Sequence, residues 1–214
     1  MLPIWIFDAF VNPSGDVVAF AVNVKLLVVE ALLLETNTAT DSNDFTTGQI
    51  FVSSANAGVN NGILTSQQAT SPDGTNNAWK LVDNNDGNTG TVNLRYYNTN
   101  VPSNSYNTVS LFVKKQGNND WVYFHIFDYG SFGRNIWFNI ANGTIGNVGS
   151  GVTASIDDYG NGWYRISVTF QTTIDTIGAV HFRLATSNGG GNITRNGTNG
   201  AYIYGLQAES HATR

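Results

Sequence analysis

The sequence has no cysteine among its 214 residues. This absence excludes disulfide bridges, zinc sites made of thiolates and a cysteine nucleophile. Charged residues are also scarce, at 12% of the chain, with three Glu and four Lys in all. Surface helices are normally built from Glu, Lys, Ala and Leu, so the scarcity of Glu and Lys argues against a helical fold.

The place of the charged residues is taken by Asn, at 28 positions, and by 23 Gly with many Thr and Ser. These residues favour turns and strands, because their side chains or their flexibility compete with the helical backbone. An apolar share of 41%, with 12% aromatic residues, is enough for a hydrophobic core. The composition therefore predicts one folded, mostly β domain, or one such domain with an appendage.

Positive charge is in deficit, because 10 Lys and Arg stand against 15 Asp and Glu, for a formal net charge of −5. Proteins that grip nucleic-acid phosphates normally carry a basic surface, so no nucleic acid is expected as a partner. Uninterrupted apolar runs of membrane-spanning length, about 20 residues, are missing as well. The residues that interrupt the apolar start of the chain are Asp8, Asp16, Asn23, Lys25 and Glu30. These interruptions argue against membrane insertion. A secretory signal is not expected either, since no Lys or Arg precedes the apolar stretch.

The first 35 residues form a region of their own, rich in apolar residues and poor in turn residues. A turn at Pro13-Ser14-Gly15-Asp16 separates residues 4–11 from 17–24, which is typical of two short strands. Residues 16–35 fit strands and also an amphipathic helix, since Leu26, Val29 and Leu33 partly follow a 3.6-residue period. So short a segment cannot bury its own apolar side chains. We expect residues 1–43 to be an attachment and oligomerisation arm with a linker, followed by a domain at 44–214.

After the linker, apolar runs recur with turn signals between them. The runs predicted to be strands are 50–53, 78–84, 91–97, 106–115, 121–128, 136–140, 153–158, 163–172, 179–186 and 201–208. The separators include Asn142-Gly143 and Gly160-Asn161-Gly162, whose residues supply the positive φ angles of tight hairpins. About ten strands with such turns predict an all-β fold, a jelly-roll β-sandwich.

Alternation along the strands predicts which side chains enter the core. In residues 106–115, Val109, Leu111 and Val113 share one face, as in a strand with one buried side. Residues 121–128 differ, because both faces of that strand are apolar or aromatic. This strand is expected either to be buried on both sides or to display aromatic side chains.

Five segments in a fixed order carry a family resemblance. They are Ser71-Pro72-Asp73-Gly74 with 78–82, then 109–115, 137–146, 155–168 and 202–209. Their order and spacing resemble a jelly-roll module, similar to non-catalytic carbohydrate-binding modules, that is abundant in tailed-phage virion proteins such as head fibres, decoration proteins and tail adhesins. The resemblance covers about residues 44–213.

The resemblance implies a non-enzymatic structural virion protein of a tailed phage, made in the host cytoplasm and displayed on the capsid surface as a decoration or head-fibre protein. Its module would cement capsomers, adhere weakly to glycans, or do both, with avidity arising from many copies. The implied partners are the major capsid protein or other virion proteins, further copies in a homo-oligomer such as a trimer, and a host-surface glycan. The alternatives are a stand-alone carbohydrate-binding module or tail adhesin, and a polysaccharide lyase-like enzyme.

A sugar site needs aromatic faces for the C–H groups of the ring and polar side chains for its hydroxyls. The candidate platform with both ingredients consists of Trp121, Tyr123, His125, Trp137, Asn135 and Asn139. The alternative is that these aromatic side chains fill the interior of the sandwich. For Trp163, Tyr164 and Arg165 the structural interpretation is favoured, because a Gly-rich turn and strand alternation already account for them.

No cofactor is expected, apart from a structural Ca²⁺ that the resemblance implies at Asp44 and Glu209, near the ends of the domain. The three histidines are too scattered to suggest zinc. Asp157-Asp158 is disfavoured as a catalytic pair, because adjacent strand residues point to opposite faces. The sequence has no nucleophile elbow, phosphate loop or HExxH motif. A lyase-like enzyme would use His125 and Tyr129.

Overall fold

The computed structural model describes residues 8–11, 17–20, 43–45, 50–51, 61–101, 103–127, 133–173 and 176–211. The chain forms two compact units, Met1–Leu34 and Glu35–Arg214. Within these ranges the regular structure consists of antiparallel strands without an α-helix, which confirms the all-β prediction. Among the residues so described, no helix has the length and apolar character required to cross a membrane.

The described part of the first unit is a two-stranded sheet of β1 (Asp8–Val11) and β2 (Val17–Phe20). Val11 pairs with Val17 and Asp8 pairs with Phe20, so the predicted pair of strands on either side of residues 12–16 is confirmed. For residues 16–35 the strand interpretation holds at Val17–Phe20, and residues 21–35 lie outside the described part. The role of this unit as an attachment arm stays a prediction.

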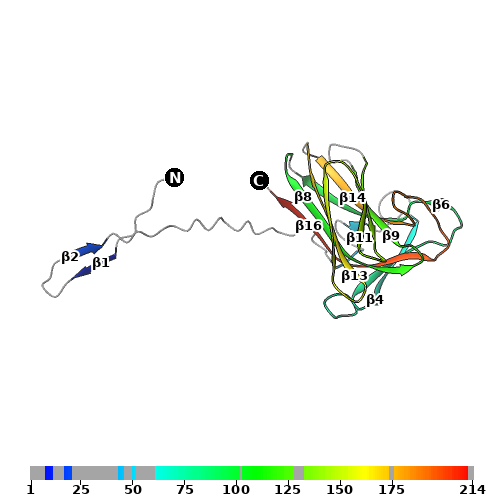
Figure 1. The fold of residues 1–214 in the computed structure, drawn as a ribbon, viewed down its shortest axis with the longest axis horizontal. Coiled ribbons are helices and arrows are strands. Elements are labelled where there is room, and N and C mark those ends of the chain that lie inside the picture. The colour runs from blue at the N-terminus through cyan, green and yellow to red at the C-terminus, as the bar shows by residue number, and fades with distance from the viewer. Residues whose placement is uncertain are drawn as a thin grey trace. The chain divides into compact units, whose positions relative to one another are not determined.

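The second unit is a sandwich of two sheets, each with six strands in the described residues (Figure 1). The first, called the β9 sheet, has the strand order β11 (Thr144–Val148), β10 (Arg134–Asn139), β9 (Trp121–Phe127), β14 (Thr176–Ala185), β7 (Asn93–Val101) and β3 (Ile50–Phe51). The second, called the β8 sheet, has the order β12 (Val152–Asp158), β13 (Trp163–Gln171), β8 (Tyr106–Gly117), β16 (Asn199–His211), β5 (Ala78–Asp83) and β4 (Gly62–Ala69). A short pair joins β15 (Ile193–Thr194) and β6 (Thr89–Gly90).

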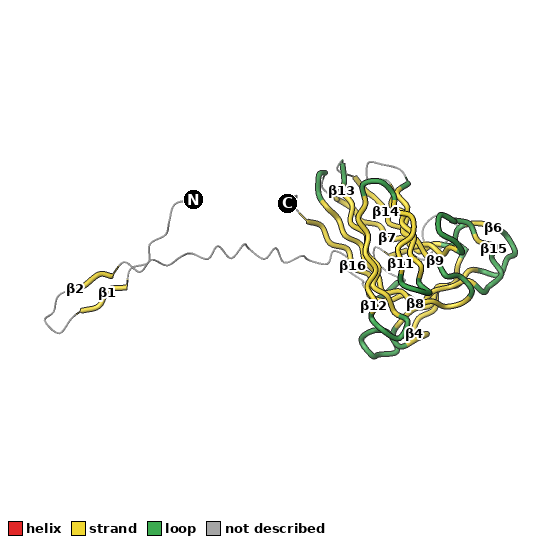
Figure 2. The backbone as a smooth tube through the Cα atoms, viewed as in Figure 1, coloured by secondary structure: helices red, strands yellow, loops and turns green. Residues whose placement is uncertain are grey.

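The chain crosses repeatedly between the two layers, which are visible with their connecting loops in Figure 2. It passes from β7 to β8, back to β9, and again from β11 to β12 and from β13 to β14. As a result β14 lies between β9 and β7, although these strands are far apart in the sequence. These crossings place side chains from four separate segments on one surface of the β9 sheet.

Each of the ten runs predicted as strands contains a strand in the structure. Two longer strands, β4 and β11, are not predicted by the sequence. Their side chains are mostly exposed, and in β4 it is Leu64 that packs against the core. Both strands lie at sheet edges, where the alternation of apolar and polar residues that marks a half-buried strand is weak.

Tight turns contain Gly and Asn where the sequence predicts them. Gly143, with φ of 70°, lies between β10 and β11. Gly160, Asn161 and Gly162 have φ of 78°, 53° and 79° and join β12 to β13. These left-handed conformations are accessible to Gly and tolerated by Asn, which explains the composition of the separators.

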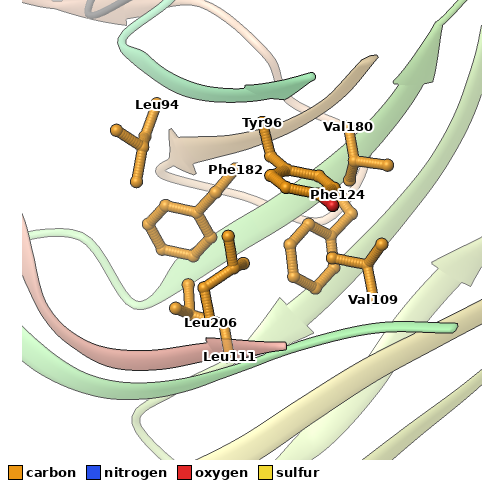
Figure 3. Close-up of a pocket in the computed structure, with 8 residues that line it drawn as sticks. All are labelled: Leu94, Tyr96, Val109, Leu111, Phe124, Val180, Phe182 and Leu206. Atoms are coloured by element: carbon orange, nitrogen blue, oxygen red, sulfur yellow. The ribbon is translucent and has the colours of Figure 1, made fainter. Parts of the chain in front are cut away.

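The core lies between the sheets and takes alternate side chains from each. Val109, Leu111 and Val113 are at most 3% exposed, as their spacing predicts. Figure 3 shows the small cavity that remains among core side chains of both sheets, lined by Leu94, Tyr96, Val109, Leu111, Phe124, Val180, Phe182 and Leu206. Its volume of about 10 Å³ is room for a single water molecule. The cavity therefore belongs to the packing of the core and is too small for an organic ligand.

Candidate functional site

The outward side of β10, β9, β14 and β7, called the basic face below, gathers aromatic, amide and basic side chains. Strand alternation produces it. The even-numbered residues of β9 enter the core, so Trp121, Tyr123 and His125 point away from the core. The same rule turns His181 and Arg183 of β14 outward, because Val180, Phe182 and Leu184 are buried in the core.

Strand pairing arranges the outward side chains in rows. In one row, Tyr123 pairs with Trp137 of β10 on one side and with Arg183 of β14 on the other. Arg183 pairs in turn with Asn93 of β7. Directly paired residues have Cβ atoms about 5 Å apart, so side chains from four strands can contact one another along this row.

A second row lies beside the first, two residues along each strand. His125 pairs with Asn135 of β10 and with His181 of β14, and His181 pairs with Arg95 of β7. The Nδ1 atom of His125 lies 2.5 Å from Oδ1 of Asn135. The rings of His125 and His181 have centroids 5.5 Å apart. This row is made of hydrogen-bonding and basic groups, whereas the first row is largely aromatic.

Tyr123 and Trp137 form an aromatic stack, with ring centroids 5.1 Å apart and planes within 15° of parallel. The stack is buried, with exposed fractions of 2% for Tyr123 and 9% for Trp137. Loop 186–192 lies against it, because Nε1 of Trp137 donates a 2.8 Å hydrogen bond to the carbonyl of Gly190. A Cβ atom on Gly191 would lie 2.9 Å from the Tyr123 hydroxyl, so the glycines let the loop backbone approach the stack closely.

Trp121 extends this aromatic group toward β11 and stays partly exposed. Gly146 of β11 lies beside its ring, since a Cβ atom there would come within 2.6 Å of Cζ3 of Trp121. Asn188 of loop 186–192 holds β11 at this point, because its Oδ1 accepts a 2.7 Å hydrogen bond from the backbone N–H of Asn147. Trp121 is thus packed against the Tyr123–Trp137 stack and against Gly146 of β11, while part of its side chain faces solvent.

Arg183 links the aromatic stack to His181. Its Cζ lies 5.6 Å from the ring centroid of Tyr123, and its Nη1 donates to the Tyr123 hydroxyl over 3.2 Å. Its Nη2 donates to Nδ1 of His181 over 2.9 Å. A guanidinium group can only donate, so Nδ1 of His181 accepts and the ring proton of the neutral imidazole is on Nε2.

His181 is held in its neutral form. It is 4% exposed. Burial, together with the charges of Arg183, Arg95 and His125, lowers the pKa of His181 from 6.5 to about 3. Its Nε2–H and the Nε–H of Arg183 are buried and have no hydrogen-bond partner within the described ranges. Buried donors normally have an acceptor, so these two N–H groups of the basic face are exceptions within the described residues.

All six residues predicted for a sugar platform lie on the same side of β9 and β10. Trp121, His125 and Asn135 are partly exposed, and the Tyr123–Trp137 stack lies beneath loop 186–192. Asn139 pairs with Trp121, and its Oδ1 accepts hydrogen bonds from the backbone N–H groups of residues 141 and 142, at 2.9 and 3.2 Å. Its amide oxygen therefore caps the turn after β10. Contact between these six residues and a sugar stays a prediction.

Sequence reasoning missed Arg95, His181 and Arg183. A signal for two of them was present, because His181 and Arg183 alternate with apolar residues along β14 and so share its outward side. What the sequence did not reveal is that β14 pairs with β9, which brings these residues beside His125 and Tyr123.

The calcium hypothesis concerns Asp44 and Glu209, and the lyase hypothesis concerns His125 of the basic face together with Tyr129. No group of three or more His, Asp or Glu side chains suited to a metal ion occurs in the described part of the chain, so neither Asp44 nor Glu209 belongs to one there. The calcium site stays a prediction. Tyr129 lies outside the described residues, and His125 is the member of that pair that can be placed.

On the β8 sheet, the residues given a structural interpretation have internal partners. Trp163 is 3% exposed and donates from Nε1 to the carbonyl of Thr70 over 3.1 Å. Arg165 donates to the carbonyl of Gly205 over 2.9 Å, and its Cζ lies 4.4 Å from the ring centroid of Phe112. These contacts account for both side chains without a ligand.

No protein-family model and no curated protein match the sequence. Among solved structures, the chain is similar to the enzymatically active domain of bacteriophage CBA120 tailspike protein 4, at 9% identity and a TM-score of 0.47, over 82% of this chain and 21% of that one. It is similar to TmCBM61, solved with β-1,4-galactotriose, at 7% identity and a TM-score of 0.43, over 82% and 99% of the two chains. It is also similar to the CBM22-1 xylan-binding domain of Paenibacillus barcinonensis Xyn10C, at 11% identity and a TM-score of 0.42, over 75% and 86%. Likeness at this level does not assign a function, which has to be inferred from the residues of this chain.

Proposed function

We propose that this protein binds glycans through the basic face of the β9 sheet and does not catalyse a reaction on them. The observation that carries the proposal is that the partly exposed Trp121 and the hydrogen-bonding groups of His125 and Asn135 lie on the same outward side of β9 and β10, with the buried Tyr123–Trp137 stack between them. A sugar ring offers C–H groups on its faces and hydroxyls around its rim. An aromatic group that adjoins a polar row matches both parts of such a ligand.

The support beneath this surface favours binding. Its side chains stand on strands whose opposite side is the core, and loop 186–192 fixes the stack through Trp137 and Gly190. Side chains that are already held in place lose little conformational entropy when a ligand arrives. Trp121 and Asn135, which are partly exposed, are the residues we expect to contact the sugar directly.

The setting we propose is the capsid surface of a tailed phage, where the chain would act as a decoration or head-fibre protein. Two observations support this setting. One is the sequence resemblance over residues 44–213, and the other is the division of the chain into Met1–Leu34 and Glu35–Arg214, which suits an anchor that carries a displayed module. Many copies on one particle would convert weak glycan binding into avidity.

Glycan binding is tested on a glycan array with the wild-type protein and with Trp121→Ala and Asn135→Ala. Each substitution should weaken binding about tenfold, because each removes a direct contact with the sugar. The matched control is Tyr159→Ala, which deletes an aromatic side chain that is 57% exposed on the loop between β12 and β13. A wild-type protein that binds no glycan, or two folded variants that bind like wild type, would contradict the proposal.

The virion setting is tested separately, by electron microscopy of purified particles labelled with a gold-coupled antibody against this chain. Label on the capsid is expected. Particles without label would exclude the virion setting, and label confined to the tail would favour a tail adhesin.

A further inference from the structure

Charge is distributed unevenly between the two sheets. The strands of the β9 sheet contain five basic residues and no Asp or Glu, in a chain whose 15 acidic residues outnumber its 10 Lys and Arg. The basic residues are Arg95, His125, Arg134, His181 and Arg183, of which all but Arg134 lie on the basic face. The strands of the β8 sheet contain as many basic residues, but they also contain four acidic ones: the basic residues are Lys80, Lys114, Lys115, Arg165 and His211, and the acidic residues are Asp83, Asp157, Asp158 and Glu209.

Among the described residues, Arg183 has no counter-ion of the kind that a partly buried guanidinium group normally has. Arg195 shows the usual arrangement, because its Nε and Nη2 bond both oxygens of Asp86, at 2.9 and 2.7 Å. Arg183 donates to Tyr123 and His181, both uncharged acceptors, and forms no salt bridge with any described residue. A desolvated cation without an anion is costly to the folded protein, so an anion from outside would be bound favourably here.

The unpartnered donors say where such an anion would bind. Nε2–H of His181 and Nε–H of Arg183 are both buried without an acceptor among the residues described. The two residues are separated by one position on β14 and so share its outward side. An N–H on a cation and an N–H from the next outward position of the same strand are donors suited to an acidic group, whose oxygens accept strong, charge-assisted hydrogen bonds.

We infer that the ligand of the basic face is an acidic glycan, whose carboxylate or sulfate group accepts hydrogen bonds from Arg183 and His181 while a sugar ring lies toward Trp121. This inference rests on the proposed glycan binding and adds the class of glycan. Nucleic acid is a poorer match to the same donors, since the net charge of −5 repels an extended polyanion while a single acidic group is drawn to the local positive field.

The test uses immobilised glycans in matched pairs, with uronate- and sialate-containing glycans beside their carboxyl-reduced forms and sulfated glycans beside their desulfated forms. The wild-type protein should bind the acidic member about tenfold more tightly than its neutral partner, and salt should weaken this binding. The carboxylate and sulfate pairs distinguish the two acidic groups. Arg183→Gln should abolish the preference, whereas Lys80→Gln, which removes the same charge from the β8 sheet, should keep it.

A second variant keeps the inference testable if Arg183→Gln does not fold. His181→Gln keeps the net charge but places an amide where the ring donor stood, and it should reduce the acidic preference about threefold. Circular dichroism establishes that each variant is folded. If folded Arg183→Gln and His181→Gln keep the full preference for acidic members, the inference is overturned.

The other outcomes separate this inference from the function on which it rests. A wild-type protein that prefers the neutral members, and loses binding in Trp121→Ala, would overturn the acidic class and leave glycan binding standing. Absence of binding to both members of every pair would overturn both proposals. Single-stranded DNA bound as tightly as the acidic glycans would also overturn the inference, because it would indicate a site for polyanions in general.

Discussion

Acidification should destabilise the sandwich through His181, the imidazole buried in the basic face. The ring is 4% exposed and accepts a hydrogen bond from Arg183 at Nδ1, so protonation of that nitrogen would break the bond and bury a second positive charge. The pKa of this ring is lowered from 6.5 to about 3, mainly by burial. The charges of Arg183 on β14, Arg95 on β7 and His125 on β9 lower it further. In the unfolded chain the residue regains its ordinary pKa of about 6.5.

The sign and size of the effect follow from proton linkage. Between pH 6.5 and 3 the unfolded chain binds a proton at His181 that the folded protein does not bind, so the contribution of this residue to stability is complete above pH 6.5 and is lost as the pH falls. At pH 5 about 97% of the unfolded imidazole is protonated, and the free energy of unfolding should be about 2 kcal/mol lower than at pH 8. This figure hardly changes as long as the folded pKa stays below about 4.

The assay is urea denaturation of wild type and His181→Gln at pH 8 and pH 5. Glutamine does not titrate, and its amide oxygen can still accept from Arg183. Other ionisable groups act alike in both proteins, so the difference between them isolates His181. Relative to the variant, the wild type should lose about 2 kcal/mol of unfolding free energy between pH 8 and pH 5. If wild type and variant lose the same unfolding free energy between pH 8 and pH 5, to within about 0.5 kcal/mol, the buried, neutral imidazole is refuted.

Two further predictions concern the supports of the fold and of the site. Asp83, 1% exposed, accepts from the backbone N–H groups of Asn196 and Asn199 at 2.9 and 3.0 Å. Asp83→Ala strands both donors and should lower the free energy of unfolding in urea by about 3 kcal/mol, and a loss under about 1 kcal/mol would contradict this role. Trp137→Phe keeps an aromatic ring but deletes the donor to Gly190. It should cost about 1 kcal/mol and speed amide hydrogen exchange in loop 186–192, whereas unchanged exchange would show that the bond does not anchor the loop.

The strands that could be predicted from the sequence are those buried on one face, because apolar residues then recur at every second position. Residues 106–115 are an example, because Val109, Leu111 and Val113 recur at every second position and all three are buried. The turn at 160–162 could also be predicted, since its positive φ angles require residues such as Gly and Asn. Strand β4 leaves no such mark, because it lies at an edge and most of its side chains are exposed.

The candidate site also has a part that could be predicted from the sequence and a part that could not. Trp121, Tyr123 and Trp137 could be predicted together, because β9 and β10 are consecutive along the chain and pair directly. Arg95 and His181 join them from β7 and β14, which repeated crossings between the sheets bring into the same sheet as β9. Strand order across a sandwich depends on tertiary packing, and periodicity within a strand carries no information about it. The aromatic half of the basic face is therefore visible in the sequence and its charged half is not.

The charged half also carries a cost that the aromatic half does not. The buried Nε2–H of His181 and Nε–H of Arg183 have no acceptor in the described part of the chain, and each such donor costs the folded protein about 1–3 kcal/mol. Small apolar side chains would avoid that cost on this side of β14, as they do at Ala179 and Ala185, which are 2% and 0% exposed. An acidic ligand that reached these donors would supply the acceptors and the counter-ion that the described residues do not. The stability that β14 gives up at these two positions would thus be recovered when the ligand binds, which makes the same two side chains the link between folding stability and ligand choice.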